Sequence, residues 1–319
     1  MTTRRTYLCK KAPRFRNGHS RTTQEREARI IQEFRSEFRL TILLEATQFP
    51  KATYMYWQKR LERKNPDASL EKKMKEIFDE NNGNYCYRRI QLALKEQGIN
   101  INQKKIRRMM SKLGLKSTKF IRKSRRYNSY KGTAGKEMKN LIHRRFSTSI
   151  PHQKITTDTS DFKYYARDKN KKLLIKKLYL DTFLDMYNGE IISYQIAESL
   201  TAKAVLDAQT EAIVGTKDCP YRRTYHSDQG LAYQMKQYKK ALINQNIFQS
   251  MSRKSNCFDN SPMENFFGLL KQEMYYGVIY TSFEQLEQAI ENSLHYYNHH
   301  QIKTKLGCSP IQYRKQMTA

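Results

Sequence analysis

The pattern of apolar residues after Pro151 constrains the fold of this chain more than any other feature. Three runs have the apolar character of β-strands, at residues 155–162, 173–186 and 190–197. Asn188-Gly189 is a strong signal for a hairpin turn between the last two runs. Helix and strand patterns then alternate, with a helix over 201–214, a strand ending at Asp228, a helix over 233–244 and a strand at 247–251. This order predicts an α/β fold, in which helices flank a mixed sheet.

Basic side chains are concentrated in the first half of the chain. The whole chain carries 60 Lys and Arg against 30 Asp and Glu, a formal charge of +30. Residues 1–150 contain 38 basic and 13 acidic side chains, whereas residues 151–319 contain 22 and 17. We expect DNA as the polyanion that such a surface binds, because neutralised phosphates release their counterions. On charge alone, a ribosome-associated or merely soluble basic protein is the alternative.

The segment 85–115 predicts a helix-turn-helix-like unit. One helix stops at Gly98, and Asn102 caps a second helix, which Gly114 ends. We expect DNA contacts from the basic residues of this unit and of the tract after it, namely Arg88, Arg89, Lys104, Lys105, Arg107, Arg108, Lys112, Arg122, Lys123, Arg125 and Arg126. An ordinary helical hairpin with a solvated basic face is the alternative interpretation.

Composition and pattern together predict four segments. They are a basic arm with a helical part at 1–66, the helix-turn-helix-like DNA-binding domain at 67–116, a basic linker at 117–150, and the α/β core with a helical tail at 151–319. In the first segment, residues 1 to about 28 lack periodicity, and the apolar positions from Ala28 to Leu44 fit one helical face. The five cysteines form no Cys-x-x-Cys pair, so we expect neither a disulfide framework nor a zinc site. No apolar run approaches the roughly 18 residues of a membrane span, so we expect a cytoplasmic protein without a membrane partner.

Three carboxylates stand where the predicted elements could bring them together. Asp158 lies on the first strand, Asp228 ends a later strand, and Glu264 lies near the start of a helix, with 35 residues between Asp228 and Glu264. Three acids can hold a pair of divalent cations, and two-metal sites of this kind move phosphodiester bonds. We expect His226 and Asn260 to support these acids by positioning them, since two-metal chemistry needs no separate general base.

Each acid also has a purely structural explanation. Asp228 could cap a turn, and Glu264 could complete a capping box with Ser261 at the helix start. Three other acids compete with Asp158 for its role, namely Asp161, Asp181 and Asp185. The helical face that Glu264 shares with Lys271 would suit a metal ligand beside a DNA phosphate, and Lys271 is therefore a further candidate for DNA contact.

Several motifs resemble the DDE transposase and retroviral integrase superfamily, which has a ribonuclease-H-like core. They are Thr-Thr-Asp158, His-Ser-Asp228-Gln-Gly and Asp-Asn-Ser-Pro-Met-Glu264. More narrowly, the chain resembles the OrfB product of the insertion-sequence-three family, with further matches at residues 85–90, 184–194, 252–260, 296–298 and 306–310. The likeness extends over about residues 54–315.

The resemblance implies a DNA transposase. It assigns Asp158, Asp228 and Glu264 as the catalytic residues and the ligands of two Mg²⁺ ions, which Mn²⁺ can replace. Water would cleave a phosphodiester at an element end, and the freed 3′-hydroxyl would attack another phosphodiester directly. The implied partners are double-stranded DNA (terminal inverted repeats and target DNA), further copies of this chain in a homo-oligomer on DNA, and an upstream-frame (OrfA) partner or fusion. The implied location is the bacterial cytoplasm, in association with the nucleoid.

The sequence also departs from the family pattern. Gln301 stands where relatives typically have arginine, a change expected to weaken a DNA or structural contact. The first 50 residues match little of the family, which fits the downstream product of two frames. Two other functions stay open: a catalytically inactive DNA-binding regulator of transposition, and another ribonuclease-H-like nuclease. The complete set of acids argues against the regulator, and the basic domain and the Asp228–Glu264 spacing argue against the nuclease.

Overall fold

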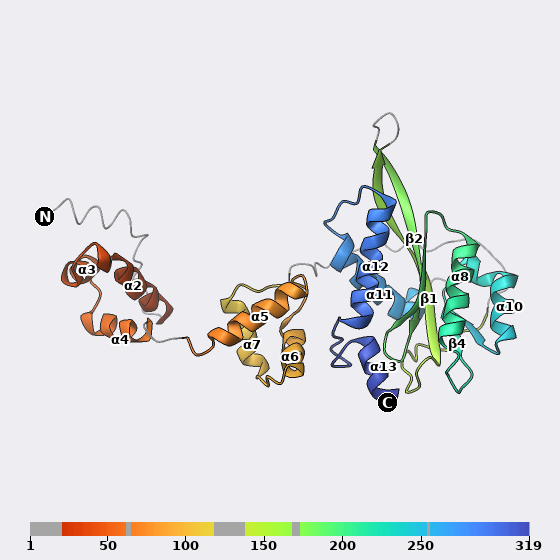
Figure 1. The fold of residues 1–319 in the computed structure, drawn as a ribbon, viewed down its shortest axis with the longest axis horizontal. Coiled ribbons are helices and arrows are strands. Elements are labelled where there is room, and N and C mark those ends of the chain that lie inside the picture. Colours follow the sequence, from red (N-terminus) through yellow and green to blue (C-terminus); the bar gives the residue numbers. More distant parts are fainter. Residues whose placement is uncertain (1–20, 62–64, 118–137, 168–172, 254–255, 319) are drawn as a thin grey trace. The chain divides into compact units, whose positions relative to one another are not determined.

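The computed structural model describes residues 21–61, 65–117, 138–167, 173–253 and 256–318. The chain divides into two compact units, Met1–Lys72 and Lys73–Ala319 (Figure 1). The division falls within α5 (Ala68–Glu80).

The first unit is a small group of helices around an apolar core. It consists of α2 (Arg21–Glu33), the 3₁₀ helix η1 (Phe34–Ser36), α3 (Leu40–Thr47) and α4 (Lys51–Leu61). The side chains that these helices bury together are Ala28, Ile31, Leu43, Phe49, Tyr54 and Trp57.

The single helical face predicted from Ala28 to Leu44 is wrong, because the chain turns between α2 and α3. Arg39 has an extended backbone (φ −64°, ψ 144°) that no α-helix can contain. Leu43 is buried after this turn, whereas Ile42 is 40% exposed. α2 also begins at Arg21, inside the stretch in which no periodicity was expected.

The second unit begins with the predicted pair of helices. α6 (Tyr87–Glu96) and α7 (Gln103–Lys112) pack beside α5 around buried side chains that include Ile90, Ile106 and Met109. The predicted cap is confirmed, since the side chain of Asn102 accepts a hydrogen bond from the backbone N–H of Lys104 at 2.8 Å. Both helices end where predicted, at glycines with left-handed backbones: φ is 77° at Gly98 and 69° at Gly114.

A five-stranded mixed sheet forms the centre of the second unit. Its strands are β1 (Lys154–Arg167), β2 (Leu173–Asp185), β3 (Ile191–Ala197), β4 (Thr224–Ser227) and β5 (Phe248–Met251). They lie in the order β3-β2-β1-β4-β5, with antiparallel pairing from β3 to β1 and parallel pairing from β1 to β5. The mixed sheet predicted from the sequence is therefore confirmed, and this order of strands is the ribonuclease-H-like one.

Helices cover both faces of the sheet (Figure 1). α8 (Ala202–Gly215) and α10 (Lys236–Asn244) pack on one face through a cluster that includes Ile155 and Phe183. The helix predicted over 233–244 is in fact two, because Met235 is extended between α9 (Leu231–Gln234) and α10.

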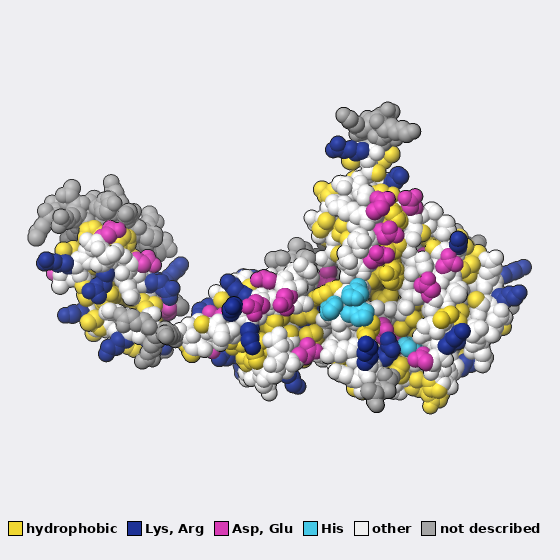
Figure 2. All heavy atoms as spheres, in the orientation of Figure 1, with side chains coloured by type: hydrophobic (Ala, Val, Ile, Leu, Met, Phe, Trp, Pro, Cys, Tyr) yellow, Lys and Arg dark blue, Asp and Glu magenta, His cyan; other side chains and the backbone are white. Residues whose placement is uncertain are grey.

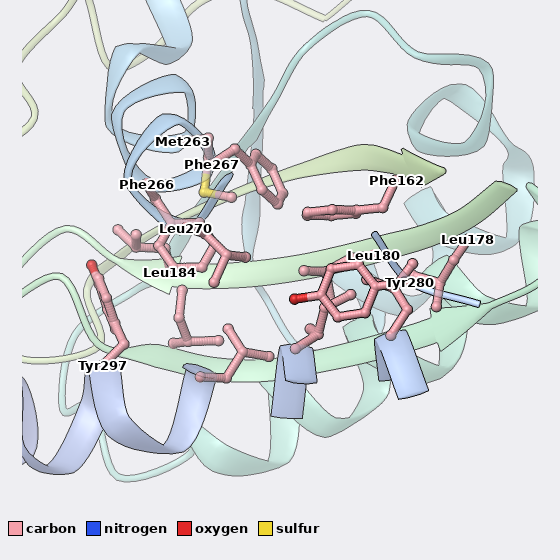
Figure 3. Close-up of a cluster of buried hydrophobic side chains, with 14 of the residues drawn as sticks. Phe162, Leu178, Leu180, Leu184, Met263, Phe266, Phe267, Leu270, Tyr280 and Tyr297 are labelled. Carbon is pink, nitrogen blue, oxygen red and sulfur yellow. The ribbon is translucent and has the colours of Figure 1, made fainter. Parts of the chain in front are cut away.

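The opposite face carries α11 (Ser261–Leu270), its continuation as the π-helix η3 (Lys271–Tyr275), and α12 (Phe283–His299). Figure 3 shows how side chains of β1 and β2 meet those of α11 in this second core, among them Phe162, Leu180, Leu184, Met263, Phe266 and Leu270. The short helix η2 (Cys257–Asn260) leads into α11, and α13 (Pro310–Thr318) ends the described chain.

Buried polar contacts tie α6 to the segment that follows α11. The carboxylate of Glu273 accepts two hydrogen bonds from Nε2 of Gln301, at 2.7 and 2.8 Å, and lies 3.7 Å from Nη1 of Arg89. Lys303 donates from Nζ to Oε1 of Gln301 at 3.3 Å, and burial followed by the Arg89 charge lowers the pKa of Lys303 to about 7. Gln301 is fully buried, so it makes a structural contact here that holds the helix-turn-helix-like unit on the core.

Tyrosines extend the same junction. The hydroxyl of Tyr85 accepts a hydrogen bond from the N–H of Ile302 at 3.0 Å and donates to the carbonyl of His300 at 3.3 Å. Tyr296 on α12 donates to the side chain of Asn81, near the end of α5. Contacts between residues about 215 positions apart therefore fix α5 and α6 against the tail of the core.

Replacing Gln301 tests how much this buried contact contributes. We expect Gln301→Ala to lower the free energy of unfolding by about 1–3 kcal/mol, because the half-buried Glu273 carboxylate loses two hydrogen bonds. Urea denaturation measures the difference, and Gln288→Ala, at an exposed position on α12, is the matched control. A loss no larger than that of the control would mean that Arg89 holds Glu273 without help from Gln301.

Candidate active site

Parallel pairing of β1 with β4 brings two of the predicted acids to one edge of the sheet. The last paired residues are Thr156 on β1 and His226 on β4. Asp158 and Asp228 each lie two residues beyond that pair, so the register leads to the same level on adjacent strands. Both therefore lie at the carboxyl end of β4, the edge at which open α/β sheets bind ligands.

The third acid approaches from the helix that covers the sheet. Thr156, Phe162 and Tyr164 face α11 and α12, and strand alternation puts Asp158 on the same side. Glu264 lies in the first turn of α11. The pKa of Asp158 is raised well above its usual range, first by burial and then by the negative charges of Asp228, Glu264 and Asp181. The fold thus brings together the acids that the sequence placed far apart.

The turn cap expected at Asp228 is present in the structure, whereas the capping box expected at Glu264 is not. Asp228 does hold a turn, since its Oδ1 accepts a hydrogen bond from the N–H of Gly230 at 2.8 Å. Burial nevertheless raises the pKa of Asp228. The capping box between Ser261 and Glu264 is absent, because η2 runs directly into α11 and the N-cap is Asn260. Glu264 is exposed and is therefore not held back against the helix start.

His226 and Asn260 join the strands to the start of α11. The side chain of Asn260 accepts a hydrogen bond from Oγ1 of Thr156 and donates to the carbonyl of Thr157 at 3.2 Å. Nε2 of the buried His226 lies 2.8 Å from the carbonyl oxygen of Asp259, and burial lowers the pKa of His226. These bonds set the distance between α11, which carries Glu264, and the two strands that carry the other acids.

Sequence reasoning missed the role of Asp259. Its fully buried carboxylate accepts hydrogen bonds from Nε and Nη2 of Arg253, at 2.8 and 2.9 Å, and from Nε of Arg144 at 2.8 Å. Asn140 adds a further bond at 3.1 Å. These donors, Arg253 first, hold the pKa of Asp259 far below its usual range. Arg253 is six residues from Asp259, whereas Arg144 comes from a segment 115 positions away, which local sequence patterns do not indicate.

The rivals of Asp158 have partners of their own. Asp161 pairs with Lys177 at 3.0 Å on an exposed part of the hairpin, and Asp185 accepts bonds from the backbone N–H groups of His152 and Tyr187. Asp181 lies closest to the site: Thr159 donates to it, and burial raises its pKa to about 6. Asp181 thus adds negative charge beside Asp158 from the other face of the sheet.

The three acids have the chemistry of a site for hard cations. Carboxylate oxygens are the ligands that Mg²⁺ prefers, and a cation would relieve the repulsion that raises the pKa of Asp158. In the part of the chain that the structure describes, no three His, Cys, Asp or Glu side chains surround a single point closely enough to enclose one ion. The arrangement suits ions that bind few side chains and share their remaining positions with water and phosphate.

The structure separates the candidates for DNA contact into three groups. Exposed on α6 and α7 are Arg88, Lys104, Arg107, Arg108 and Lys112, with Lys105 half-buried beside them. Some candidates also contact the protein itself: Arg89 lies against Glu273, Nζ of Lys271 lies 4.8 Å from the centre of the Phe162 ring, and Nε of Arg88 donates to the hydroxyl of Tyr87 at 3.2 Å. Four candidates lie outside the described residues, namely Arg122, Lys123, Arg125 and Arg126.

Acidic side chains gather over α12 and α8 on the face of the core drawn in Figure 2. The charges of Glu291 and Glu284 add to burial in raising the pKa of Glu287, so these carboxylates are close enough to repel one another. Negative charge on this face disfavours contact with DNA phosphates.

Comparison with known proteins places these features in a family. Family models described as integrase core domains match residues 149–257 and 264–317, and a model described as an HTH-like domain matches residues 64–125. The chain is 37% identical over 290 residues to InsK of insertion sequence element IS150 from Escherichia coli, which is named as a transposase, covering 90% of this chain and 98% of InsK. It is 42% identical over 219 residues to a transposase-like protein of Haemophilus influenzae, covering 68% and 95% of the two chains.

Solved structures of integrases are also similar. The HTLV-2 integrase catalytic core in complex with magnesium matches 51% of this chain and 97% of its own, with 16% identity and a TM-score of 0.38. An intasome of simian T-cell lymphotropic virus matches 70% and 69%, with 16% identity and a TM-score of 0.42.

An integrase-type core joined to a helix-turn-helix-like unit defines a DNA transposase or integrase. This chain belongs to the insertion-sequence-three family of transposases, as the extent of its match to InsK shows. The function of the family is DNA transposition, and DNA is therefore a partner of this chain. None of the described helices is both long and apolar enough to cross a bilayer.

The buried Asp259 predicts how stability depends on pH. Because the fold depresses its pKa, this carboxylate stabilises the folded protein at pH values above about 4 and loses that effect as the pH falls below its unfolded-state pKa. We expect Asp259→Asn to lower the melting temperature clearly at pH 7 and by progressively less below pH 4. Calorimetry over this pH range measures the difference, with the exposed Asp207→Asn on α8 as control. A difference that does not change with pH would contradict the assignment.

Proposed function

We propose that this chain cleaves and joins DNA at the ends of its own insertion sequence, with Asp158, Asp228 and Glu264 as the catalytic carboxylates. The observation that carries the proposal is the convergence of these acids, one from β1, one after β4 and one from α11, where burial and then the charges of Asp228 and Glu264 raise the pKa of Asp158. The charges of both other acids act on Asp158. It is therefore the residue suited to contact both of two divalent cations.

The proposed cations are two Mg²⁺ ions, which Mn²⁺ can replace. When bound, such a pair activates the attacking oxygen and stabilises the leaving oxygen of an in-line displacement. The protein would supply oxygen ligands of fixed position, because Asn260 and His226 hold the start of α11 against β1 and β4. Asp228 is further oriented by the N–H of Gly230. In this proposal none of these groups forms a covalent bond to DNA.

DNA would reach the acids along the carboxyl edge, away from the acidic surface of α12. The exposed basic residues of α6 and α7 would bind the phosphates of the terminal inverted repeats, and the junction through Glu273 would hold that duplex at a fixed distance from the core. We further propose that the chain works as a homo-oligomer on DNA, with an OrfA partner or fusion, and associates with the bacterial nucleoid in the cytoplasm. The buried contacts of Gln301 remove the one feature that favoured an inactive regulator.

Excision in cells tests the catalytic assignment. A plasmid carries the native element ends, and the upstream frame is supplied together with either the wild-type chain or Glu264→Gln. We expect junction-bearing DNA circles with the wild type and a loss of at least about a hundredfold with Glu264→Gln, because one ligand of the cations loses its charge. PCR across the circle junction measures the product, and Glu291→Gln on α12 is the control.

Purified protein separates catalysis from binding. Chelation by EDTA should abolish release of the 3′-hydroxyl, added Mg²⁺ or Mn²⁺ should restore it, and Glu264→Gln should still bind the ends. Absence of product from the wild type despite binding would favour the regulator.

The salt dependence of DNA binding tests the role of α7. We expect Lys104→Ala and Arg107→Ala each to weaken binding to the element ends and to reduce the slope of log K against log salt concentration by about 1. Fluorescence anisotropy over a range of salt concentrations measures both. Lys240→Ala, exposed on α10, is the matched control. Slopes that equal the wild-type value would place these side chains outside the DNA interface.

A further inference from the structure

An aromatic ring lies open to solvent beside the candidate active site. Phe258 is 66% exposed in η2, directly before the Asp259-Asn260 pair that anchors α11. The bond between Thr156 and Asn260 fixes this segment to β1, and Asp158 lies two residues further along that strand, roughly 7 Å by the rise of a β-strand. Phe258 therefore lies close enough to Asp158 for one or two nucleotides of a bound strand to reach from the ring to the carboxylate.

One arginine lies over this ring, and a second binds the carboxylate of the neighbouring Asp259. The guanidinium carbon of Arg144 lies 5.9 Å from the centre of the Phe258 ring, and Arg253 shares Asp259 with Arg144. The side chains of Arg144 and Arg253 are 48% and 61% exposed. Their hydrogen bonds to Asp259 and Asn256 use Nε and Nη2 of each guanidinium, which leaves Nη1 of each outside these bonds. The buried Asp259 carboxylate thus orients the guanidinium groups of Arg144 and Arg253, and both side chains are still largely exposed.

The backbone around Arg144 is held in an uncommon conformation. His143 and Arg144 have φ values of 49° and 61°, in the left-handed region that side chains other than glycine rarely adopt. Hydrogen bonds from the N–H groups of Ile142 and His143 to Oδ1 of Asn140 hold this turn. Strained backbone of this kind persists where the surrounding structure requires a particular side-chain direction, here that of the Arg144 guanidinium.

The segment also borders Asp228. Ser252, which follows β5, accepts a hydrogen bond at its carbonyl from Nε2 of Gln229 at 3.0 Å, and its N–H donates to the carbonyl of Ser227 at 2.8 Å. Arg253 therefore lies on the same carboxyl edge as the acid after β4. Together Phe258, Arg144 and Arg253 form an aromatic and basic surface next to both aspartates, which we call the end platform.

We propose that the end platform binds the nucleotide adjacent to the scissile phosphodiester, with Phe258 stacked on its unpaired base and Arg144 and Arg253 on its phosphate. The inference rests on the proposed function of the acids. A base inside a duplex has both faces covered by its neighbours, so an exposed phenylalanine can stack only on a base that has left the helix. Stacking then offsets the unfavourable unpairing, and the arginines hold the phosphate beside the carboxylates.

Strand cleavage with matched substrates tests the stacking. We expect Phe258→Ala to reduce 3′-hydroxyl release about five- to a hundredfold on a fully paired element end, and Phe258→Trp to stay near the wild-type rate. A mismatch at the base pair next to the scissile phosphodiester removes most of the cost of unpairing. If stacking on Phe258 normally offsets that cost, the mismatch should restore most of the rate to Phe258→Ala. Phe248→Ala is the control, because Phe248 is 40% exposed beneath Arg222 at the start of β5, on the opposite edge of the sheet.

Photocrosslinking locates the base without relying on catalysis. A 5-iodouracil placed next to the scissile phosphodiester in the same duplex should crosslink to Phe258 in both wild-type and Glu264→Gln protein, as mapped by mass spectrometry. Equal loss of rate by Phe258→Ala on paired and mismatched ends, or no crosslink to Phe258 while cleavage proceeds, would overturn the end platform and leave the proposed function intact. A crosslink to Phe258 with no cleavage by the wild type would instead support the platform and overturn the catalytic proposal.

Discussion

The contacts between the start of α11 and the two central strands are the interaction on which the candidate site depends. Asn260 bonds to β1, the carbonyl of Asp259 lies against His226 of β4, and the Asp259 carboxylate is locked by two arginines. Parallel pairing aligns Asp158 with Asp228, and apolar packing holds α11 on the sheet, but these bonds are what fix the start of α11, and with it Glu264, against the two strands. The like charges of the acids repel one another, so neutral and oppositely charged partners beneath them must supply the attraction.

A second network of polar contacts joins the helix-turn-helix-like unit to the α/β core. Glu273 lies in the π-helix that continues α11, and it contacts Gln301 and, through Arg89, the helix-turn-helix-like unit. π-helical turns are rare and occur often at functional sites. The helix that carries Glu264 is therefore held at both ends, by strands at its start and by the DNA-binding unit at its continuation. A buried glutamine at position 301 is part of this second attachment.

Much of the fold could be predicted because local patterns agreed with the tertiary structure. The three strands, the Asn102 cap and the glycine-ended helices follow from the apolar period and from backbone preferences that act over a few residues. The prediction failed at Arg39 and Met235, where extended residues interrupt helical patterns so that the flanking helices can pack. It also failed for the Ser261–Glu264 capping box, because η2 extends the helical start upstream.

The sequence by itself determined the order of strands and helices along the chain, the basic character of the front half and the three candidate acids, of which Asp158 lies on a predicted strand, Asp228 at a strand end and Glu264 near a helix start. Each follows from residue type and spacing along the chain. Only the tertiary structure decided that Asp181 adds charge beside Asp158, that Arg89 faces Glu273, and that Arg144 and Arg253 share Asp259 next to an exposed Phe258. Arg253 is only six residues from Asp259, but the other partners lie far apart along the chain. Local patterns carry no information about which distant partners packing will bring together.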